Sequence, residues 1–362
     1  MRVVCLVRAD TSSEGKERVL LCAQKYQIAF DSKEKNRISC LCGNLEKEQL
    51  GLSQKEYADL TTHIDLIIHS AAMVNFIYPY ESLRKANVQS LYEIIKIAAT
   101  VKIKPIHFIS SIGVFNSLFA KNVEFIDEDT ALTDDLPISG YFQTKWVCEQ
   151  MCLKARAKGI PVSVYRPSGI TINNQTKVTS DDDLTYVFLK LCKNIAAFPN
   201  IGAITDIVPV DYVAQSVVQL SRDYPSAQNN YNLTSGQLVN AEDLSSQLME
   251  NSIVEIITYD EFLKRVLVFI QNTEDAQLKK LVPLITSKDF SPLGPDKVSP
   301  VFQNKKTSQL LRTAINPDIK GSIRLLLSQV GSVLSLQAKE GRRPRPVVPG
   351  SLRAGCFSAG KI

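Results

Sequence analysis

The chain has 362 residues, of which 22% are charged, and its formal net charge is +5. This length is enough for one large α/β domain or two smaller ones. Part of the positive charge comes from Arg342, Arg343, Arg345 and Arg353 near the end, so charge gives no case for nucleic-acid binding. No apolar run is long enough to span a membrane, and the charged start does not resemble a signal peptide.

Eight cysteines in a chain of this length are too sparse for a disulfide scaffold. Cys40 and Cys42 lack a second ligand pair at metal-binding spacing, so no metal site is predicted. Cys148 and Cys152 lie four residues apart on a predicted helix, and we expect them to be core residues or free thiols. A reducing cytoplasm is the expected location.

Apolar runs and amphipathic stretches alternate along the first two thirds of the chain, which predicts repeated βαβ units and a parallel sheet. Such strands are buried on both faces. The predicted strands are Val3–Val7, Ile38–Cys42, Asp65–His69, Pro105–Ile109 and Val162–Tyr165. The predicted helices between them are Lys16–Lys25, Tyr80–Thr100 and Tyr141–Ala157. This order predicts an α/β, Rossmann-like, doubly wound fold.

From about Thr171 the pattern becomes mostly helical, which predicts a smaller substrate lid over the sheet's C-terminal edge. The predicted elements are helices at Leu184–Ile195, Asp211–Leu220, Ala241–Met249 and Tyr259–Gln271 and a strand at Asn230–Leu233. We therefore predict a cofactor-binding region at 1–170, joined by parts of 200–235, and a lid at 171–335. The segment 339–362 is rich in Arg, Pro and Gly, and we expect it to be a disordered basic tail.

Tyr141 and Lys145 are separated by one helical turn, so both side chains lie on one face of their helix. Reduction of a carbonyl needs a proton donor, and a nearby ammonium lowers the pKa of a tyrosine phenol. Ser110 and Ser111 follow a predicted strand, and of the two Ser111 better matches the position of a hydroxyl that holds the carbonyl oxygen. The predicted catalytic residues are therefore Ser111, Tyr141 and Lys145. Gly140 suits a close approach of backbone at the helix start.

Asn87 lies inside the helix after the third strand. It is either a solvent-facing or locally bonded polar residue, or one that organises the backbone and anchors Lys145 through water. Ala71 and Ala72 follow the third strand and are small enough to let a cofactor lie close to the backbone. His69, at the end of the same strand, is expected to be packed and to have no acid/base role.

Arg8 follows the first predicted strand directly, where an acidic residue would bind the 2′-hydroxyl of NAD. An arginine there pairs with the 2′-phosphate of NADP, or it is a plain surface residue. The sequence favours NADP(H) as the cofactor.

Together these features resemble the thioester reductase domains, a branch of the extended short-chain dehydrogenases/reductases. Such domains terminate nonribosomal peptide and polyketide synthetases and occur in carboxylic acid and aminoadipate reductases. The matching segments are Cys5–Ala9, Gly43–Leu45, Leu50–Ser53, Val74–Tyr80, Ala86–Val88, Gly140–Trp146, Tyr165–Pro167, Val208–Val213 and Phe302–Pro317. The resemblance covers roughly residues 1–320.

The resemblance implies NADPH-dependent reduction of an acyl or peptidyl thioester on a phosphopantetheinyl carrier domain, or of an acyl-CoA, to an aldehyde or an alcohol. It implies that Lys145 also orients the nicotinamide ribose and that Asn44 and Leu45 lie near the cofactor. Asn44 stands where the family usually has Asp, which is expected to weaken the adenine contact.

None of the sixteen glycines forms the G-x-x-G-x-x-G turn that the family uses to hold the diphosphate. We therefore expect an N-terminally truncated chain without the first βα unit, which folds poorly and binds NADPH weakly. Two other interpretations remain open at this point. One is another extended reductase, such as a fatty acyl-CoA reductase or an epimerase, and the other is an inactive remnant.

Overall fold

The computed structural model describes residues 1–121, 123–200, 206–239, 244–245, 248, 254–286, 299–311 and 317–339. Its central sheet contains β3 (Ile67–His69), β4 (Ile106–Ile109), β6 (Val162–Pro167) and β10 (Asn230–Leu233), in the order β10-β6-β4-β3. All neighbouring strands are parallel. These strands agree with the predicted ones to within two residues at each end.

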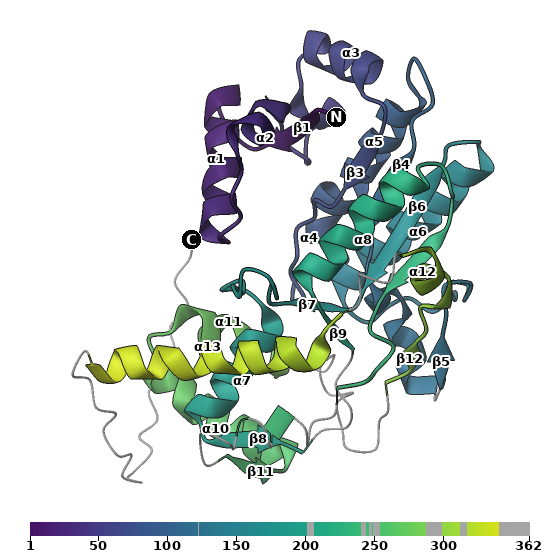
Figure 1. The fold of residues 1–362 in the computed structure, drawn as a ribbon. Helices are drawn as coiled ribbons and strands as arrows, with labels where there is room; N and C mark the ends of the chain where they lie inside the picture. The colour runs from purple at the N-terminus through teal and green to yellow at the C-terminus, as the bar shows by residue number, and fades with distance from the viewer. Residues whose placement is uncertain are drawn as a thin grey trace, which may run out of the picture.

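A second, two-stranded parallel sheet contains β1 (Val3–Val7) and β2 (Ile38–Cys42), at the predicted positions. Among the described strands, β1 pairs only with β2 and β3 pairs only with β4. Figure 1 shows β1, α1 (Ser12–Lys25) and α2 (Ser32–Arg37) set apart from β3 and β4. The prediction that every strand is buried on both faces is wrong for β1, because its Val3 and Val4 side chains are 38% and 43% exposed. One edge of β1 has no neighbouring strand among those described.

Helices cover both faces of the central sheet, as a doubly wound fold requires. Val162 and Val164 of β6 pack with α5 (Ser90–Ala99) and α6 (Gly140–Ala157) in one apolar core. Tyr165 of the same strand points the other way, into a core with α8 (Val210–Asp223) and β10. The predicted helix at Tyr80–Thr100 is confirmed as α4 (Tyr80–Arg84), the π-helical turn η2 (Lys85–Gln89) and α5 in direct succession.

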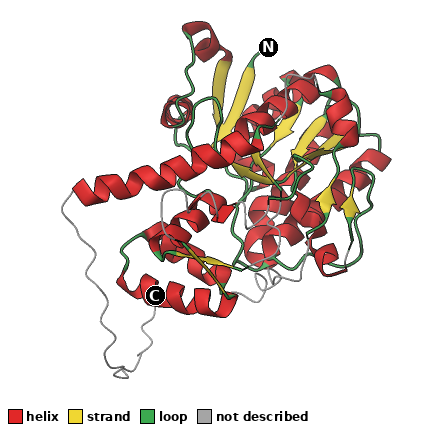
Figure 2. Cartoon of the chain, turned by 60° about the horizontal axis from the view of Figure 1, so that its bottom comes forward, coloured by secondary structure: helices red, strands yellow, loops and turns green. Residues whose placement is uncertain are grey.

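A third apolar core runs from Ile172 to Val330 and is built mainly from helices. Its described elements are α7 (Leu184–Asn194), β8 (Ala197–Pro199), β11 (Glu255–Ile257), α10 (Tyr259–Asn272), α11 (Ala276–Ile285) and α13 (Ile319–Lys339). Figure 2 shows α13 as a long helix extending along this part of the molecule. Most of the predicted helix at Ala241–Met249 and the predicted tail beyond 339 lie outside the described residues. The predicted region boundaries remain a prediction.

The remaining elements connect these layers. They are η1 (Glu48–Gly51), α3 (Gln54–His63), η3 (Ile112–Lys121), β5 (Phe125–Ile126), β7 (Gly169–Thr171), β9 (Ile207–Pro209), β12 (Val301–Phe302) and α12 (Lys305–Leu310). In the part of the chain that the structure describes, no helix is both long and apolar enough to cross a membrane.

Candidate active site

The start of α6 sets the position of the predicted catalytic pair. Ser139 caps the helix by accepting a hydrogen bond from the Phe142 backbone N–H at 3.4 Å. A Cβ at Gly140 would lie 2.5 Å from both Tyr78 O and Tyr80 N, which real Cβ atoms do not tolerate. The predicted need for glycine here is therefore confirmed, because the loop before α4 packs directly against the first residue of α6.

Lys145 connects α6 to the end of β4. Its side chain is buried, and Nζ donates a hydrogen bond to the Ile109 carbonyl oxygen at 2.7 Å. Nζ also lies 4.9 Å from the ring centroid of Phe108 and 5.9 Å from that of Tyr141. Burial lowers the pKa of Lys145, while neighbouring groups on α6 act in the opposite direction. The lysine is thus held at the C-terminal edge of the sheet, where α/β folds bind ligands.

Tyr141 is buried beside Lys145, with the Phe76 ring packed edge-on at a centroid distance of 5.3 Å. Burial raises the pKa of Tyr141 to about 12. The expectation that the lysine ammonium lowers this pKa is wrong for this structure. Desolvation is the dominant effect, and the ammonium is bonded to Ile109 rather than to the phenol.

Ser110 and Ser111 follow β4 directly, so both lie next to the carbonyl group that Lys145 contacts. Ser111 is half-buried, and its Oγ accepts a hydrogen bond from the Gly113 backbone N–H at 3.1 Å. Ser110 is buried and points elsewhere, toward Glu149. The structure therefore brings the Ser111 backbone, Lys145 and Tyr141 to one place, and their catalytic roles remain a proposal.

Asn87 is buried in the π-helical turn η2. Its side chain accepts from Met73 N at 2.7 Å and donates to Met73 O and to Thr144 Oγ1, each at 3.1 Å. It therefore fixes the loop after β3 against α6. The side chain is bonded to Thr144, the neighbour of Lys145 in the chain. The interpretation as a locally bonded residue is confirmed, and the anchoring of Lys145 through water remains a prediction.

The predicted cofactor residues lie at the C-terminal ends of β1, β2 and β3. Arg8 is exposed directly after β1, and Ala71 and Ala72 follow β3 with partly open surfaces. After β2, Asn44 accepts a hydrogen bond from the Glu46 backbone N–H at 2.9 Å, and Leu45 packs against the core of the central sheet. That Arg8, Asn44, Leu45, Ala71 and Ala72 bind the cofactor remains a prediction.

The nicotinamide end of a cofactor fits the residues near Lys145. An ammonium has three N–H donors, and among the described residues Lys145 bonds to one acceptor, Ile109 O. Two N–H groups are therefore left for ribose hydroxyls. In the part of the chain that the structure describes, no comparable set of residues is present to bind the diphosphate of the cofactor. No glycine-rich turn of the kind that holds a diphosphate occurs among the described residues.

His69, at the end of β3, is buried and stacks on Phe108 at a centroid distance of 5.9 Å. Burial, and secondly the charge of Lys145, lower its pKa to about 3. The ring is therefore neutral near pH 7 and packed, as expected from the sequence, and the expected lack of an acid/base role remains a prediction. The described residues contain no group of three or more His, Cys, Asp or Glu side chains able to hold a metal ion.

Two buried charged residues next to the site were not predicted. Glu149 lies on α6, and Arg166 lies on β6, and their side chains form an ion pair at 2.7 Å. Glu149 stands four residues after Lys145, the same spacing as between Tyr141 and Lys145. This spacing could have predicted that Glu149 lies on the same helical face as the Tyr141–Lys145 pair. The predicted free thiols at Cys148 and Cys152 are confirmed as buried free cysteines.

A parallel sheet covered on both faces, with a tyrosine and a lysine one turn apart beside a strand end, defines an extended short-chain dehydrogenase/reductase. The family model described as "Male sterility protein", a nicotinamide-cofactor-binding family, matches residues 1–217. The chain belongs to this family, in its thioester reductase branch.

Two curated relatives illustrate the branch. The chain is 33% identical over 321 residues to a linear gramicidin synthase polypeptide of Brevibacillus parabrevis, covering 86% of this chain and 6% of the relative. It is 32% identical over 244 residues to the L-2-aminoadipate reductase large subunit of Penicillium chrysogenum, covering 63% of this chain and 17% of the relative. The chain therefore spans a small part of the length of these relatives.

Solved structures agree in fold. The terminal R domain of the myxalamid PKS-NRPS pathway has 30% identity and a TM-score of 0.82, covering 92% of this chain and 84% of that one. A UDP-glucuronic acid 4-epimerase from Bacillus cereus has 13% identity and a TM-score of 0.59, covering 92% and 91% of the two chains. The second likeness shows the fold alone, so the fold by itself does not separate a reductase from an epimerase.

Proposed function

We propose that this chain uses NADPH to reduce an acyl or peptidyl thioester, held on a phosphopantetheinyl carrier domain, and releases it as an aldehyde. The observation that carries the proposal is the 2.7 Å hydrogen bond from Lys145 to Ile109, which sets Tyr141 and Lys145 of α6 beside Ser111. Relatives named as aminoadipate reductase and as the terminal R domain of a synthetase support it. The reaction takes place in the cytoplasm.

The overall reaction is thioester plus NADPH plus a proton, giving aldehyde, thiol and NADP⁺. A bound nicotinamide cofactor supplies the hydride. Ser111 and Tyr141 bind the carbonyl oxygen, and Tyr141 donates its phenolic proton as that oxygen gains charge. Lys145 holds the ribose, and its Nζ lies 5.9 Å from the centroid of the Tyr141 ring on which the phenolate is left. The carbon–sulfur bond then breaks, and the sulfur leaves with a proton as the carrier thiol.

NADP(H) is proposed over NAD(H) because Arg8 is exposed at the end of β1. The guanidinium group there can form a bidentate pair with a 2′-phosphate. Asn44, Leu45, Ala71, Ala72 and Asn87 are proposed to form or support the rest of the cofactor surface.

A second candidate is a chain that does not catalyse the reaction. The observation that favours it is that β1 and β3 pair on one side only in the described structure. Turnover on free acyl-CoA, rather than on a carrier, would instead indicate an acyl-CoA reductase.

Titration calorimetry with NADPH, followed by an aldehyde assay with matched acyl-CoA and acyl-carrier substrates, tests these functions. Binding of NADPH together with faster turnover of the acyl carrier is the expected result. A folded sample that binds no NADPH would rule out catalysis by this chain. Binding with no aldehyde from either thioester would contradict the proposed reaction while leaving cofactor binding intact.

A further inference from the structure

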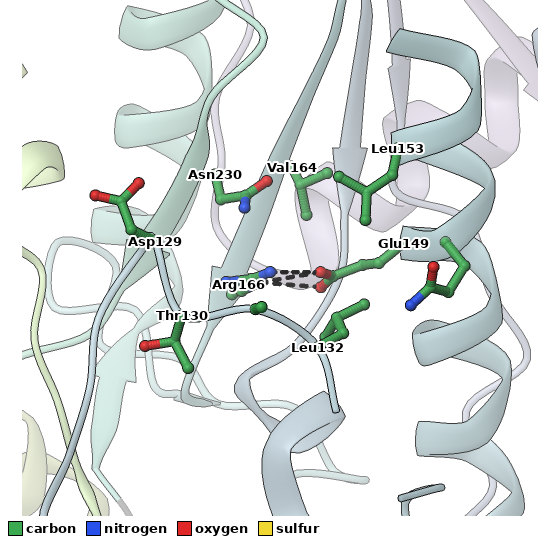
Figure 3. Close-up of a pocket in the computed structure, with 10 residues that line it drawn as sticks. Asp129, Thr130, Leu132, Glu149, Leu153, Val164, Arg166 and Asn230 are labelled. Atoms are coloured by element: carbon green, nitrogen blue, oxygen red, sulfur yellow. Dashed lines mark hydrogen bonds and ion pairs between the residues drawn. The ribbon is translucent and has the colours of Figure 1, made fainter. Parts of the chain in front are cut away.

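α6 carries a third ionisable side chain on the face that holds Tyr141 and Lys145. Glu149 follows Lys145 by four residues, one helical turn, and is 2% exposed. Figure 3 shows its side chain extending from α6 toward Arg166 of β6, at the edge of a pocket of about 400 Å³. The proposed reaction gives this carboxylate no direct part.

The contacts of Glu149 form a closed polar cluster, which we call the Glu149 cluster and which consists of Ser110, Glu149 and Arg166. Oε1 accepts from Ser110 Oγ at 2.5 Å and from Arg166 Nε at 3.1 Å. Oε2 accepts from Arg166 Nε at 3.1 Å and from Nη2 at 2.7 Å. The guanidinium carbon lies 4.8 Å from the Phe115 ring centroid, and Nη1 is buried with no hydrogen-bond partner.

A buried ion pair of this kind is a poor explanation for stability. Removing two charges from water costs several kcal/mol per ion, and their attraction offsets this cost only when every polar atom is satisfied. Arg166 Nη1 is not satisfied. An apolar pair of similar volume would stabilise the core equally well. Stability therefore does not explain the Glu149 cluster, and its position in the fold must be considered.

That position is the end of β4. Ser110 donates its backbone N–H to Tyr165 O of β6 at 2.7 Å and its hydroxyl to Glu149 of α6. The residue before it, Ile109, accepts the hydrogen bond from Lys145, and the residue after it is Ser111. The Glu149 cluster therefore fixes, from two sides, the short segment that carries the Lys145 acceptor and the proposed catalytic serine.

The charge of Glu149 also reaches Lys145. The groups that act on the pKa of Lys145 or are paired with it are His69 of β3 and Cys148, Glu149 and Cys152 of α6, with the Tyr141 ring nearby. Burial lowers the pKa of His69 to about 3, raises that of Cys148 to about 12 and raises that of Cys152 well above its ordinary value, so all three are neutral near pH 7. Cys148, Glu149 and Cys152, in this order, act to raise the pKa of Lys145. Because the two thiols are neutral near pH 7, Glu149, held in its ion pair, is the one of the three that acts by charge at that pH.

We infer that Glu149 is a positioning residue for reduction, which sets a negative charge one helical turn from Lys145 and, through Ser110, keeps Ser111 in place. This inference rests on the proposed function of Tyr141, Lys145 and Ser111. Arg166 serves to hold the carboxylate in its orientation.

The variant Glu149→Gln tests the inference because it keeps the shape and the acceptor for Ser110 but removes the charge. We expect kcat to fall roughly 10- to 100-fold with the KM for the thioester nearly unchanged, since misplaced catalytic groups cost about this much. Without the negative charge the pKa of Lys145 falls, so the alkaline limb of the pH–rate profile moves to lower pH. A limb that stays in place would overturn the inference.

Two control variants separate charge from structure. Ser110→Ala removes the hydroxyl but keeps the charge, so kcat should fall while the alkaline limb stays where it is. Glu128→Gln makes the same chemical change at another buried glutamate, one that accepts from the N–H and hydroxyl of Thr307 and is not among the groups that act on Lys145. It should leave the limb unmoved.

Glu149→Gln leaves Arg166 buried without its partner, and the variant could fail to fold for that reason. The double variant Glu149→Gln/Arg166→Met removes both charges and is expected to fold. Its alkaline limb should lie below that of the wild type. A double variant that folds and keeps the wild-type limb would contradict the inference.

A readout without turnover distinguishes this inference from the proposed function. In protein labelled with ¹³C at lysine Cε, the Lys145 signal is identified as the one that Lys145→Arg lacks, and its titration midpoint is followed by NMR. A lower midpoint in Glu149→Gln supports the inference even if no thioester is reduced. An unchanged midpoint in an active enzyme would overturn it and leave the proposed function standing.

Discussion

The Nζ of Lys145 and the carbonyl oxygen of Ile109 lie 2.7 Å apart, and this contact joins a helix to the end of a strand thirty-six residues earlier. Because Lys145 is buried and its pKa is lowered by desolvation, the carbonyl dipole compensates part of the cost of burying the ammonium. The residues on either side of this contact are those proposed to act on the substrate.

Replacing Tyr141 by phenylalanine should abolish most turnover. The substitution keeps the ring that packs against Phe76 but removes the proton donor, and general-acid catalysis contributes about 10²- to 10⁴-fold. A loss of this size in kcat/KM with an unchanged melting temperature is the expected result. Tyr92→Phe, at a tyrosine that is 50% exposed on α5, is the matched control and should retain activity. Near-normal activity of Tyr141→Phe would exclude the proposed role.

Replacing Arg8 by serine should change the choice of cofactor. Loss of a charge-assisted pair with the 2′-phosphate should weaken NADPH binding about tenfold or more and leave NADH binding nearly unchanged. Calorimetric titration with each cofactor measures the two dissociation constants. Arg18→Ser removes an exposed arginine from the middle of α1 and serves as the control. Equal losses for NADPH and NADH in Arg8→Ser would refute the assignment.

Gly140→Ala should damage both stability and activity. The added Cβ would lie 2.5 Å from the backbone at Tyr78 and Tyr80, so the first turn of α6 must shift. Overpacking of this kind costs about 1–3 kcal/mol, and the shift moves Tyr141 with it. Denaturant unfolding and kcat/KM are both measured.

The comparison for this variant is Gly159→Ala. Gly159 has φ +85° with no atom near its added Cβ, so it should lose stability through backbone strain while keeping its specific activity. Equal specific activity in the two variants would contradict the proposed importance of the α6 start.

Stability should fall in mild acid because of His69. Burial lowers its pKa in the folded protein to about 3 from 6.5, so the unfolded chain binds more protons than the folded one between these values. The contribution is complete above pH 6.5 and is lost progressively as the pH falls. Between pH 6.5 and 5 the expected loss is about 2 kcal/mol, at 1.36 kcal/mol per pH unit.

His69→Phe removes the titrating ring and keeps an aromatic side chain to stack on Phe108. Its unfolding free energy, measured by urea titration at pH 5 and pH 7, should vary less with pH than that of the wild type. His63→Phe, at the exposed end of α3, is the control. An equally steep pH dependence in His69→Phe would show that acid acts elsewhere.

The sequence by itself determined the alternation of strands and helices, because buried parallel strands and amphipathic helices leave local patterns of apolar residues. It also determined the Tyr141–Lys145 pair, since a four-residue spacing places two side chains on one helical face whatever surrounds the helix. The close approach at Gly140 was likewise foreseeable from glycine at a helix start.

The tertiary structure decided what depends on groups distant in the chain. The pKa of Tyr141 rises rather than falls because of burial, which no local pattern reports. The split of the sheet into two parts depends on which strands pair in space. The Glu149 cluster joins residues 110, 149 and 166 from three elements, and only their packing reveals that a buried carboxylate stands behind the proposed catalytic lysine.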